Sequence, residues 1–175
     1  MSQLSYKSTK ILISGDGEKE NFLNLLVHTT EFVSKPIDFQ TDKYTVSAGH
    51  HFVVIEDSEN QNPINPTILV LLRSENEEKT KQLLASVTPG GIVIFDEENP
   101  EISQLVAASS NYFRKIPFQT PPFEMQQQQL LLDTNLGIIP VNAKEWRPAL
   151  FEAAKHLSQQ LGIMEEEFYE SLINF

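Results

Sequence analysis

The first half of the chain contains short apolar segments. They are separated by stretches in which apolar residues have helical spacing. The apolar segments are residues 10–14, 52–56, 67–72 and 92–95. Each is apolar almost throughout, a pattern typical of strands that are covered on both faces. The helical stretches are residues 18–28, 74–86, a helix starting at Asn99-Pro100-Glu101, and residues 143–160 and 165–174. This alternation predicts an α/β fold, three-layered and doubly wound, with a mostly parallel sheet flanked by helices.

The second half of the chain carries weaker patterns. The expected elements there are a strand within 112–118, a proline bend at 117–123 and an antiparallel edge pair at 129–139. Ser74 and Glu77 have the spacing of a capping box, which predicts that a helix begins at this point. For residues 44–51 the sequence leaves two structures open, a strand and a loop over the crevice of the sheet.

A glycine turn joins the first apolar segment to the first predicted helix. Gly15 and Gly17 precede Lys19 in the segment Ser-Gly-Asp-Gly-Glu-Lys-Glu, residues 14–20. A strand, a glycine turn and a helix start together present backbone N–H groups to an anion. A phosphate-binding loop also needs a second glycine before the lysine and a hydroxyl after it, but Glu18 and Glu20 occupy those positions. The acidic side chains around Lys19 therefore predict a loop that repels a nucleotide phosphate.

Composition narrows the classes of function. The chain has 175 residues, of which 40% are hydrophobic, and a net charge of -11, so we expect one soluble domain over residues 1–175. With this charge and a pI of about 4.7 we expect no nucleic-acid partner and no membrane partner. There are no cysteines, which excludes thiol catalysis and cysteine–zinc sites. No signal peptide or membrane span is evident, which predicts a cytoplasmic protein.

Five short sequence motifs occur in a fixed order along the chain. This order identifies a family more specifically than any single motif does. The five motifs are the loop at 14–19, the strand at 52–56 that ends in Glu56, the strand at 66–72, the stretch from Lys81 to Pro100, and Ala153-Ala154 with Leu161-Gly162-Ile163 and the final residues 172–175. In this order they resemble the central ATP-binding domain of the Mur ligases, which join amino acids to peptidoglycan precursors, and of the related folylpolyglutamate synthases. The resemblance runs from about residue 10 to residue 175.

Several motifs of that family are altered. Leu72-Arg73 stands where the family has Thr-Asn, and no histidine follows in residues 74–79. The family's G-x-H-N motif is matched to residues 137–140, which read Gly-Ile-Ile-Pro. The family's small N-terminal substrate domain and its C-terminal amino-acid-binding domain have no counterpart among these segments. The resemblance therefore implies mainly a fold, and we expect no ATP-dependent ligase activity.

Gly15, Gly17 and Lys19 are the candidate cofactor-binding residues. In the functional interpretation Lys19 binds a phosphate, with ATP–Mg²⁺ or NAD as the cofactor, although neither is favoured. The alternative interpretation, which we weight more heavily, is that Lys19 is a surface lysine paired with its own flanking glutamates.

Glu56 is the candidate metal ligand. It ends a central strand, where doubly wound sheets bind ligands, and Asp57 and Glu59 follow it as further oxygen donors for Mg²⁺. The alternative is a solvated acidic loop. The resemblance also matches Lys81 to a lysine that is carbamylated in some family members, but we expect an ordinary exposed helix residue.

Histidine and aromatic residues add no catalytic pattern. His50 and His51 are adjacent in an expected extended segment, so their side chains point to opposite faces and form a poor metal site. Trp146, Phe168 and Phe175 are expected in the core, with a surface for a protein partner as the alternative.

The sequence leaves two candidate functions. The first is a non-catalytic Mur-ligase-like domain with a degraded phosphate-binding loop, acting in binding or regulation, with a protein partner or a homo-oligomer. The second is a nucleotide- or dinucleotide-binding protein, or a small-molecule enzyme, that uses the crevice at the carboxyl ends of the strands. We expect no catalytic residues in the first case.

Overall fold

A seven-stranded sheet forms the centre of the computed structural model, which describes residues 8–56, 64–74, 76–143 and 145–175. Its strands in spatial order are β3 (Thr45–Val46), β2 (Asp38–Gln40), β4 (Phe52–Glu56), β1 (Thr9–Ser14), β5 (Ile68–Leu71), β6 (Gly91–Asp96) and β7 (Phe113–Phe118). Every pair is parallel except β2 with β3, so the predicted mostly parallel α/β sheet is confirmed.

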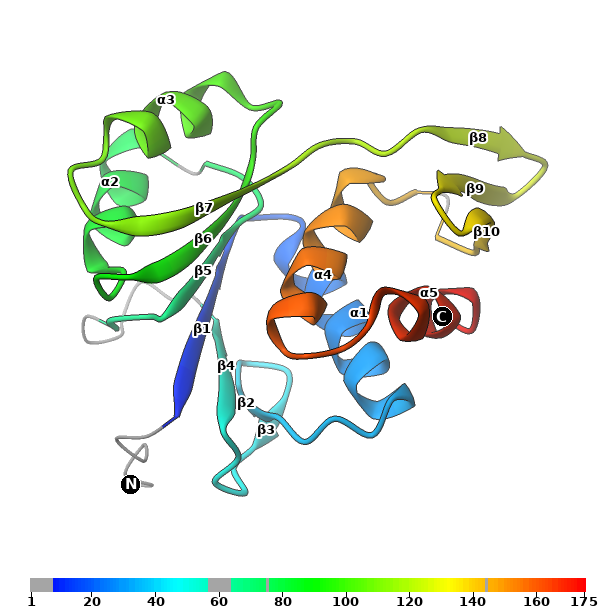
Figure 1. Ribbon diagram of the computed structural model, residues 1–175, viewed down its shortest axis with the longest axis horizontal. Helices are drawn as coiled ribbons and strands as arrows, with labels where there is room; N and C mark the ends of the chain where they lie inside the picture. The colour runs from blue at the N-terminus through cyan, green and yellow to red at the C-terminus, as the bar shows by residue number, and fades with distance from the viewer. Residues whose placement is uncertain (1–7, 57–63, 75, 144) are drawn as a thin grey trace.

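Five helices cover the sheet in the described part of the chain (Figure 1). They are α1 (Lys19–Phe32), α2 (Glu77–Ser86), α3 (Pro100–Ala108), α4 (Ala149–Gln160) and α5 (Glu165–Ile173). Helices α2 and α3 lie on one face, whereas α1 and α4 lie on the other, with α5 beyond them. None of the helices in these ranges combines the length and the apolar character needed to cross a bilayer.

The central strands are apolar throughout because they contribute side chains to two separate cores, one on each face of the sheet. Along β1, Ile11 and Ile13 pack into the core beneath α1, α4 and α5, whereas Leu12 between them packs into the core beneath α2 and α3. Strand β5 does the same, with Ile68 and Val70 on the first face and Leu69 on the second. Side chains alternate across a strand, so a strand buried on both faces shows no polar positions.

A small second sheet differs from the prediction. Strands β8 (Phe123–Gln126), β9 (Gln129–Thr134) and β10 (Gly137–Val141) form an antiparallel sheet in the order β10-β9-β8. The antiparallel pair expected at 129–139 is therefore present, but it lies apart from the edge of the main sheet. The predicted bend explains this, because the prolines after β7 carry the chain away from the main sheet and over toward α5 (Figure 1).

Two helix starts also differ from the prediction. Asn76, not Ser74, caps α2, because its side chain accepts a hydrogen bond from the Lys79 N–H at 2.7 Å. Helix α4 begins at Ala149 instead of residue 143, with Pro148 at its N-cap position.

Residues 44–51 form both a strand and a loop. Two residues pair as β3, and the following loop is held by Asp38, whose carboxylate accepts hydrogen bonds from the N–H groups of Ala48, Gly49 and His50.

Candidate functional site

The crevice at the carboxyl ends of the central strands is the place where this sheet topology positions functional groups. Strand β1 runs into the glycine turn and α1, β4 ends at Glu56, β5 leads to Leu72 and Arg73, and β6 ends at Asp96. These segments meet because neighbouring parallel strands end at the same edge of the sheet. Arg147, two residues before α4, reaches the same edge of the sheet and contacts Glu18 in the turn.

Both glycines of the turn have a structural reason to be glycine. Gly15 has a φ of +144°, and a Cβ there would lie 2.8 Å from the backbone N of Arg73 and 2.8 Å from the Cβ of Leu72. Gly17 has a φ of +79° with open space around it, so only its backbone conformation favours glycine. The turn is held against β5 by a 2.9 Å hydrogen bond from the Leu72 N–H to the Ser14 carbonyl.

Lys19 and Glu56, the two charged candidates, are brought together by the fold. The Lys19 Nζ lies 3.3 Å from a carboxylate oxygen of Glu56, and each side chain is only 17% exposed. This ion pair joins Lys19 to a different strand, whereas the alternative interpretation expected a surface lysine paired with its own flanking glutamates. Glu20, which follows Lys19 in the chain, has a largely exposed side chain and pairs with Lys43 at 2.8 Å. Asp57 and Glu59 lie outside the described residues.

Glu18 turns inward and binds Arg147. The guanidinium donates from Nε and Nη2 to the two carboxylate oxygens, both at 2.8 Å, which is the paired geometry that suits arginine and a carboxylate. Nη2 also donates to the Leu72 carbonyl at 3.0 Å, and Nη1 donates to Asp96. Glu18 and Asp96 are buried. Burial disfavours the charged guanidinium, but the two carboxylates outweigh this effect and raise the pKa of Arg147 above its ordinary value.

The ion-paired groups of the crevice are equal in number of each sign. Among the described side chains that form ion pairs there, three carboxylates, those of Glu18, Glu56 and Asp96, face three cations, Lys19, Arg147 and Arg73, whose Nε lies 3.5 Å from Glu18. Of the carboxylates expected around Lys19, Glu18 pairs with Arg147 and Glu20 pairs with Lys43. Glu18 occupies the cations at the turn, and a phosphate entering here would compete with this carboxylate for them.

Sequence reasoning missed Arg147. An arginine two residues before a helix matches no binding motif, and its partners are 129 and 51 positions away in the chain. Residues 137–140, which the resemblance matches to the G-x-H-N motif, lie in β10 of the small sheet.

The remaining candidates lie elsewhere. Lys81 pairs with Glu77 on the exposed face of α2. His50 pairs with Asp38 at 2.8 Å, whereas His51 packs edge-on against Phe52. Among the described residues no group of three or more histidine and carboxylate side chains is arranged to hold a metal ion. The three aromatic residues of the C-terminal region pack on the main core, with Phe168 fully buried and Trp146 and Phe175 partly buried.

The comparison with solved structures supports the observed fold. No protein-family model matches the sequence, and no curated protein matches it. Among solved structures, a UDP-N-acetylmuramoylalanyl-D-glutamyl-2,6-diaminopimelate–D-alanyl-D-alanyl ligase from Acinetobacter baumannii superposes with a TM-score of 0.70 at 14% identity, over 96% of this chain and 46% of that chain. A murein peptide ligase from Psychrobacter arcticus gives 0.69 at 12% identity, over 97% and 47%. Folylpolyglutamate synthetase from Lactobacillus casei gives 0.64 at 13% identity, over 97% and 63%.

The chain spans about half the length of these two ligases, which it matches at 46% and 47% of their chains. At 12–14% identity the likeness shows the backbone architecture alone. The chain therefore has the fold of a Mur-ligase-like and folylpolyglutamate-synthase-like domain.

Proposed function

We propose that this chain is a non-catalytic Mur-ligase-like domain that acts in binding or regulation, with its crevice closed by its own ion pairs. The observation that carries the proposal is the two-point contact between Glu18 and Arg147 at the turn after β1. A carboxylate of the protein there takes the hydrogen bonds that a phosphate oxygen would otherwise receive.

The neighbouring groups support the same proposal. Phosphoryl transfer depends almost wholly on positioning and on stabilising charge, so a loop lysine must be available to the phosphates. Lys19 instead pairs with Glu56 in a place where both are largely shielded from water. The residue after it, Glu20, has no hydroxyl to offer Mg²⁺ and is engaged by Lys43.

A second function keeps some support. Gly15, Gly17, Lys19 and Glu56 still lie together at the carboxyl ends of the strands, the region where open α/β sheets bind ligands. A nucleotide, a dinucleotide or a small substrate that displaced the Glu18 carboxylate would find two arginines and a lysine. This alternative makes the chain a nucleotide-binding protein or an enzyme with ATP–Mg²⁺ or NAD as cofactor.

Calorimetric titration of the purified chain with ATP–Mg²⁺, and separately with NAD, distinguishes the two functions. The non-catalytic domain predicts no saturable heat with either ligand at near-physiological salt. Micromolar binding of ATP–Mg²⁺ would contradict the proposal and call for ligase and ATPase assays, whereas binding of NAD alone would favour the dinucleotide function.

A variant with Glu18→Gly and Glu20→Thr tests whether Glu18 is what closes the crevice. We expect it to gain affinity for ATP–Mg²⁺, because it removes two carboxylates and frees Arg147 for a phosphate. Glu20→Thr alone is the matched control, since it leaves the contact between Glu18 and Arg147 intact and should gain little. Glu18→Gln, which keeps the side-chain volume, repeats the test with less risk to folding. Equal affinities in all variants would show that this turn is not a degraded phosphate site.

The partner of such a domain stays a prediction. Exposed apolar side chains occur on the small sheet and in its turn, where Phe123, Met125, Leu136 and Ile138 are all more than 40% exposed. Such side chains favour contact with another protein or a second copy over a nucleic acid. Sedimentation at several concentrations would separate a homo-oligomer from a monomer that awaits a different partner. A cytoplasmic location also remains an expectation.

A further inference from the structure

The outer strand of the small sheet has one edge that no other described strand occupies. Strand β8 ends the order β10-β9-β8, and among the described residues it pairs only with β9. All four of its residues are exposed. In Figure 1 it lies on the side of the small sheet that faces away from α5. The backbone groups along this open edge are therefore accessible to another chain.

The pairing of β8 with β9 shows which backbone groups face the open edge. The Asp133 N–H donates to the Pro122 carbonyl at 2.8 Å, just before β8 begins. In an antiparallel pair, residues that bond to the neighbouring strand alternate with residues whose N–H and C=O point away from it. Glu124 therefore bonds toward β9, whereas Phe123 and Met125 present their N–H and C=O groups at the open edge.

The same two residues carry the exposed apolar side chains of β8. Phe123 is paired with Leu132, and Met125 is paired with Leu130. Paired residues lie on one face of a sheet, and both leucines on this face are buried in the main core. Phe123 and Met125 are nevertheless 43% and 50% exposed. The apolar face of the small sheet thus continues onto β8 beyond the part that the core covers, and a strand added at the open edge would shield it.

The outer strands of the main sheet are protected against such pairing, whereas β8 is not. Strand β7 carries Arg114, Lys115 and Pro117, and β3 is only two residues long. Basic side chains, proline and short length are common means by which an edge strand avoids pairing with another chain. Strand β8 has no lysine, arginine or proline and keeps two large apolar residues. Its open edge is therefore suited to an added strand.

Charge favours a basic partner over a second copy of this chain. Residues 116–143 contain the acids Glu124 and Asp133 and no lysine or arginine. These two side chains are diagonal neighbours on the face opposite to Phe123. If two copies paired so that Phe123 of one bonded to Met125 of the other, Glu124 would lie directly opposite its own copy. Like charges in that position are destabilising, whereas a lysine or arginine there would form an ion pair with Glu124.

We propose that the open edge of β8 docks an extended basic segment of another protein. The segment continues the small sheet as an antiparallel strand, with apolar side chains beside Phe123 and Met125 and a lysine or arginine beside Glu124. This inference rests on the binding role proposed above and gives that role a place and a kind of partner. It does not involve the crevice, so titration with ATP–Mg²⁺ and titration with a peptide test the two proposals separately.

Calorimetry of the full chain with the capped peptide Thr-Val-Lys-Val-Lys-Val-Thr tests the docking edge. In this probe the valines match the apolar face of β8 and the lysines match the face of Glu124. We expect saturable binding, and about five- to tenfold weaker binding when both lysines are replaced by glutamate, because ion pairing then becomes repulsion. Absence of saturable binding by the lysine peptide would overturn the proposal, as would equal binding of the glutamate peptide.

Methylation of the peptide backbone tests whether the peptide binds as a strand. Directly opposed residues of an antiparallel pair exchange hydrogen bonds when their N–H and C=O groups face each other, so the valines opposite Phe123 and Met125 must donate to β8. We expect N-methylation of the valines to abolish binding, and N-methylation of the lysines to leave most of it. Equal effects of the two modifications would overturn the addition of a strand.

Met125→Pro is the matching change in the protein. It removes the N–H that faces the open edge, and proline is tolerated in an edge strand where the N–H makes no bond within the sheet. We expect loss of peptide binding with an unchanged circular dichroism spectrum. Met125→Ala keeps the N–H and loses only apolar contact, so it should weaken binding by about fivefold. Wild-type affinity in a folded Met125→Pro variant would contradict the proposal.

Two further variants test the role of charge. Glu124→Lys should reverse the preference, so that the glutamate peptide binds more tightly than the lysine peptide. Glu78→Gln, at an exposed position on α2, is the matched control and should leave affinity unchanged. A loss in this control as large as in Glu124→Gln would show only a general attraction to an acidic protein and would overturn the site. Self-association of the chain that Met125→Pro abolishes would assign the edge to a second copy and overturn the choice of partner.

Discussion

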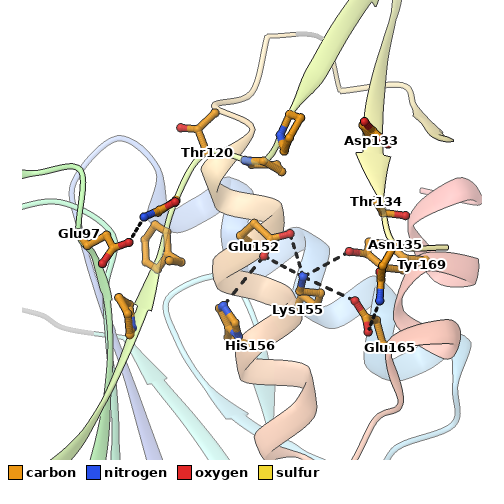
Figure 2. Close-up of a pocket in the computed structure, with 15 residues that line it drawn as sticks. Glu97, Thr120, Asp133, Thr134, Asn135, Glu152, Lys155, His156, Glu165 and Tyr169 are labelled. Carbon is orange, nitrogen blue, oxygen red and sulfur yellow. Dashed lines mark hydrogen bonds and ion pairs between the residues drawn. The ribbon is translucent and has the colours of Figure 1, made fainter. Parts of the chain in front are cut away.

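The crevice at the glycine turn and the cavity between α4, α5 and the proline bend after β7 (Figure 2) hold the same motif, a partly buried cation between two acids. In the crevice Arg147 joins Glu18 and Asp96, and in the cavity Lys155 joins Glu152 and Glu165. The two regions differ in what surrounds this motif. Among the described ion-paired groups the crevice adds two cations and one acid, so these charges cancel, whereas the cavity adds the acids Glu97 and Asp133 and keeps an excess of negative charge. A region whose charges cancel internally has little reason to bind an ion, and a region with an excess does.

The two motifs also differ in what they hold together. The guanidinium links Glu18 and Asp96 with the Leu72 carbonyl, residues 129, 51 and 75 positions away from it. The ammonium links a residue three positions away to the neighbouring helix. The crevice motif therefore ties the turn after β1, the ends of β5 and β6 and the start of α4 to one another, and the cavity motif ties together only two adjacent helices.

Removing Arg147 should have the largest effect on stability. Arg147→Ala leaves the buried carboxylates of Glu18 and Asp96 without their cation, and we expect a loss of about 3 to 4 kcal/mol in the free energy of unfolding. Urea denaturation followed by circular dichroism measures it. Arg147→Lys should recover part of this loss, because a point charge replaces the cation but not the paired hydrogen bonds.

A double variant tests whether the loss of stability arises from buried carboxylates that are left without a cation. Arg147→Met combined with Glu18→Gln should be less destabilised than Arg147→Met alone, because one of the buried charges has gone together with its partner. If the double variant is instead as unstable as the sum of the two single ones, the contact is not a coupled ion pair and the comparison of the two regions loses its basis.

Lys155 should matter less than Arg147. Lys155→Met keeps the length of the side chain and removes the ammonium, and we expect a loss of about 2 kcal/mol, because water reaches Glu152 and Glu165 through the open cavity. The same urea denaturation measures it, with exposed Lys81→Met on α2 as the control. A loss equal to that of Arg147→Ala would contradict the idea that the cavity is the more solvated of the two regions.

The sequence predicts the parts of this molecule that depend on local pattern. The strand predicted at 52–56 has the observed ends, because an apolar run between polar flanks defines a covered strand without help from the rest of the chain. The three-residue β2 escapes prediction and the two-residue β3 is left open between a strand and a loop, since so short a strand has no period to detect. The predicted start of α4 is too early, although Pro148 marks the true one, because the apolar spacing continues upstream to residue 143.

The sequence predicts the backbone of the candidate site but not the contacts of its side chains. Two glycines between a strand and a helix predict the turn, and the sequence places Lys19 and Glu56 each near a strand end. It predicts neither their contact with each other nor the inward rotation of Glu18. The rotation of Glu18 depends on Arg147, which arrives from a distant helix start and makes the burial of two carboxylates favourable. The direction in which a charged side chain points is decided by partners that the local sequence does not contain.

The smallest expected effect is a change in the pH dependence of stability through His156 in the cavity. Burial, aided by Lys155, lowers its pKa below the ordinary 6.5, against the opposing influence of Glu152, Gln159 and Glu165. The unfolded chain therefore binds a proton more readily than the folded one, so this contribution to stability is complete above the unfolded pKa and is lost as the pH falls through the folded pKa. His156→Gln should lose less stability than the wild-type chain between about pH 7.5 and about pH 5.5. Urea denaturation at each pH measures the difference, with His51→Gln, at an exposed position, as the control. A steeper fall in His156→Gln than in the wild-type chain would mean that the ring is stabilised as a cation by the surrounding carboxylates, and the excess negative charge assigned to the cavity would then be smaller than its four acids suggest.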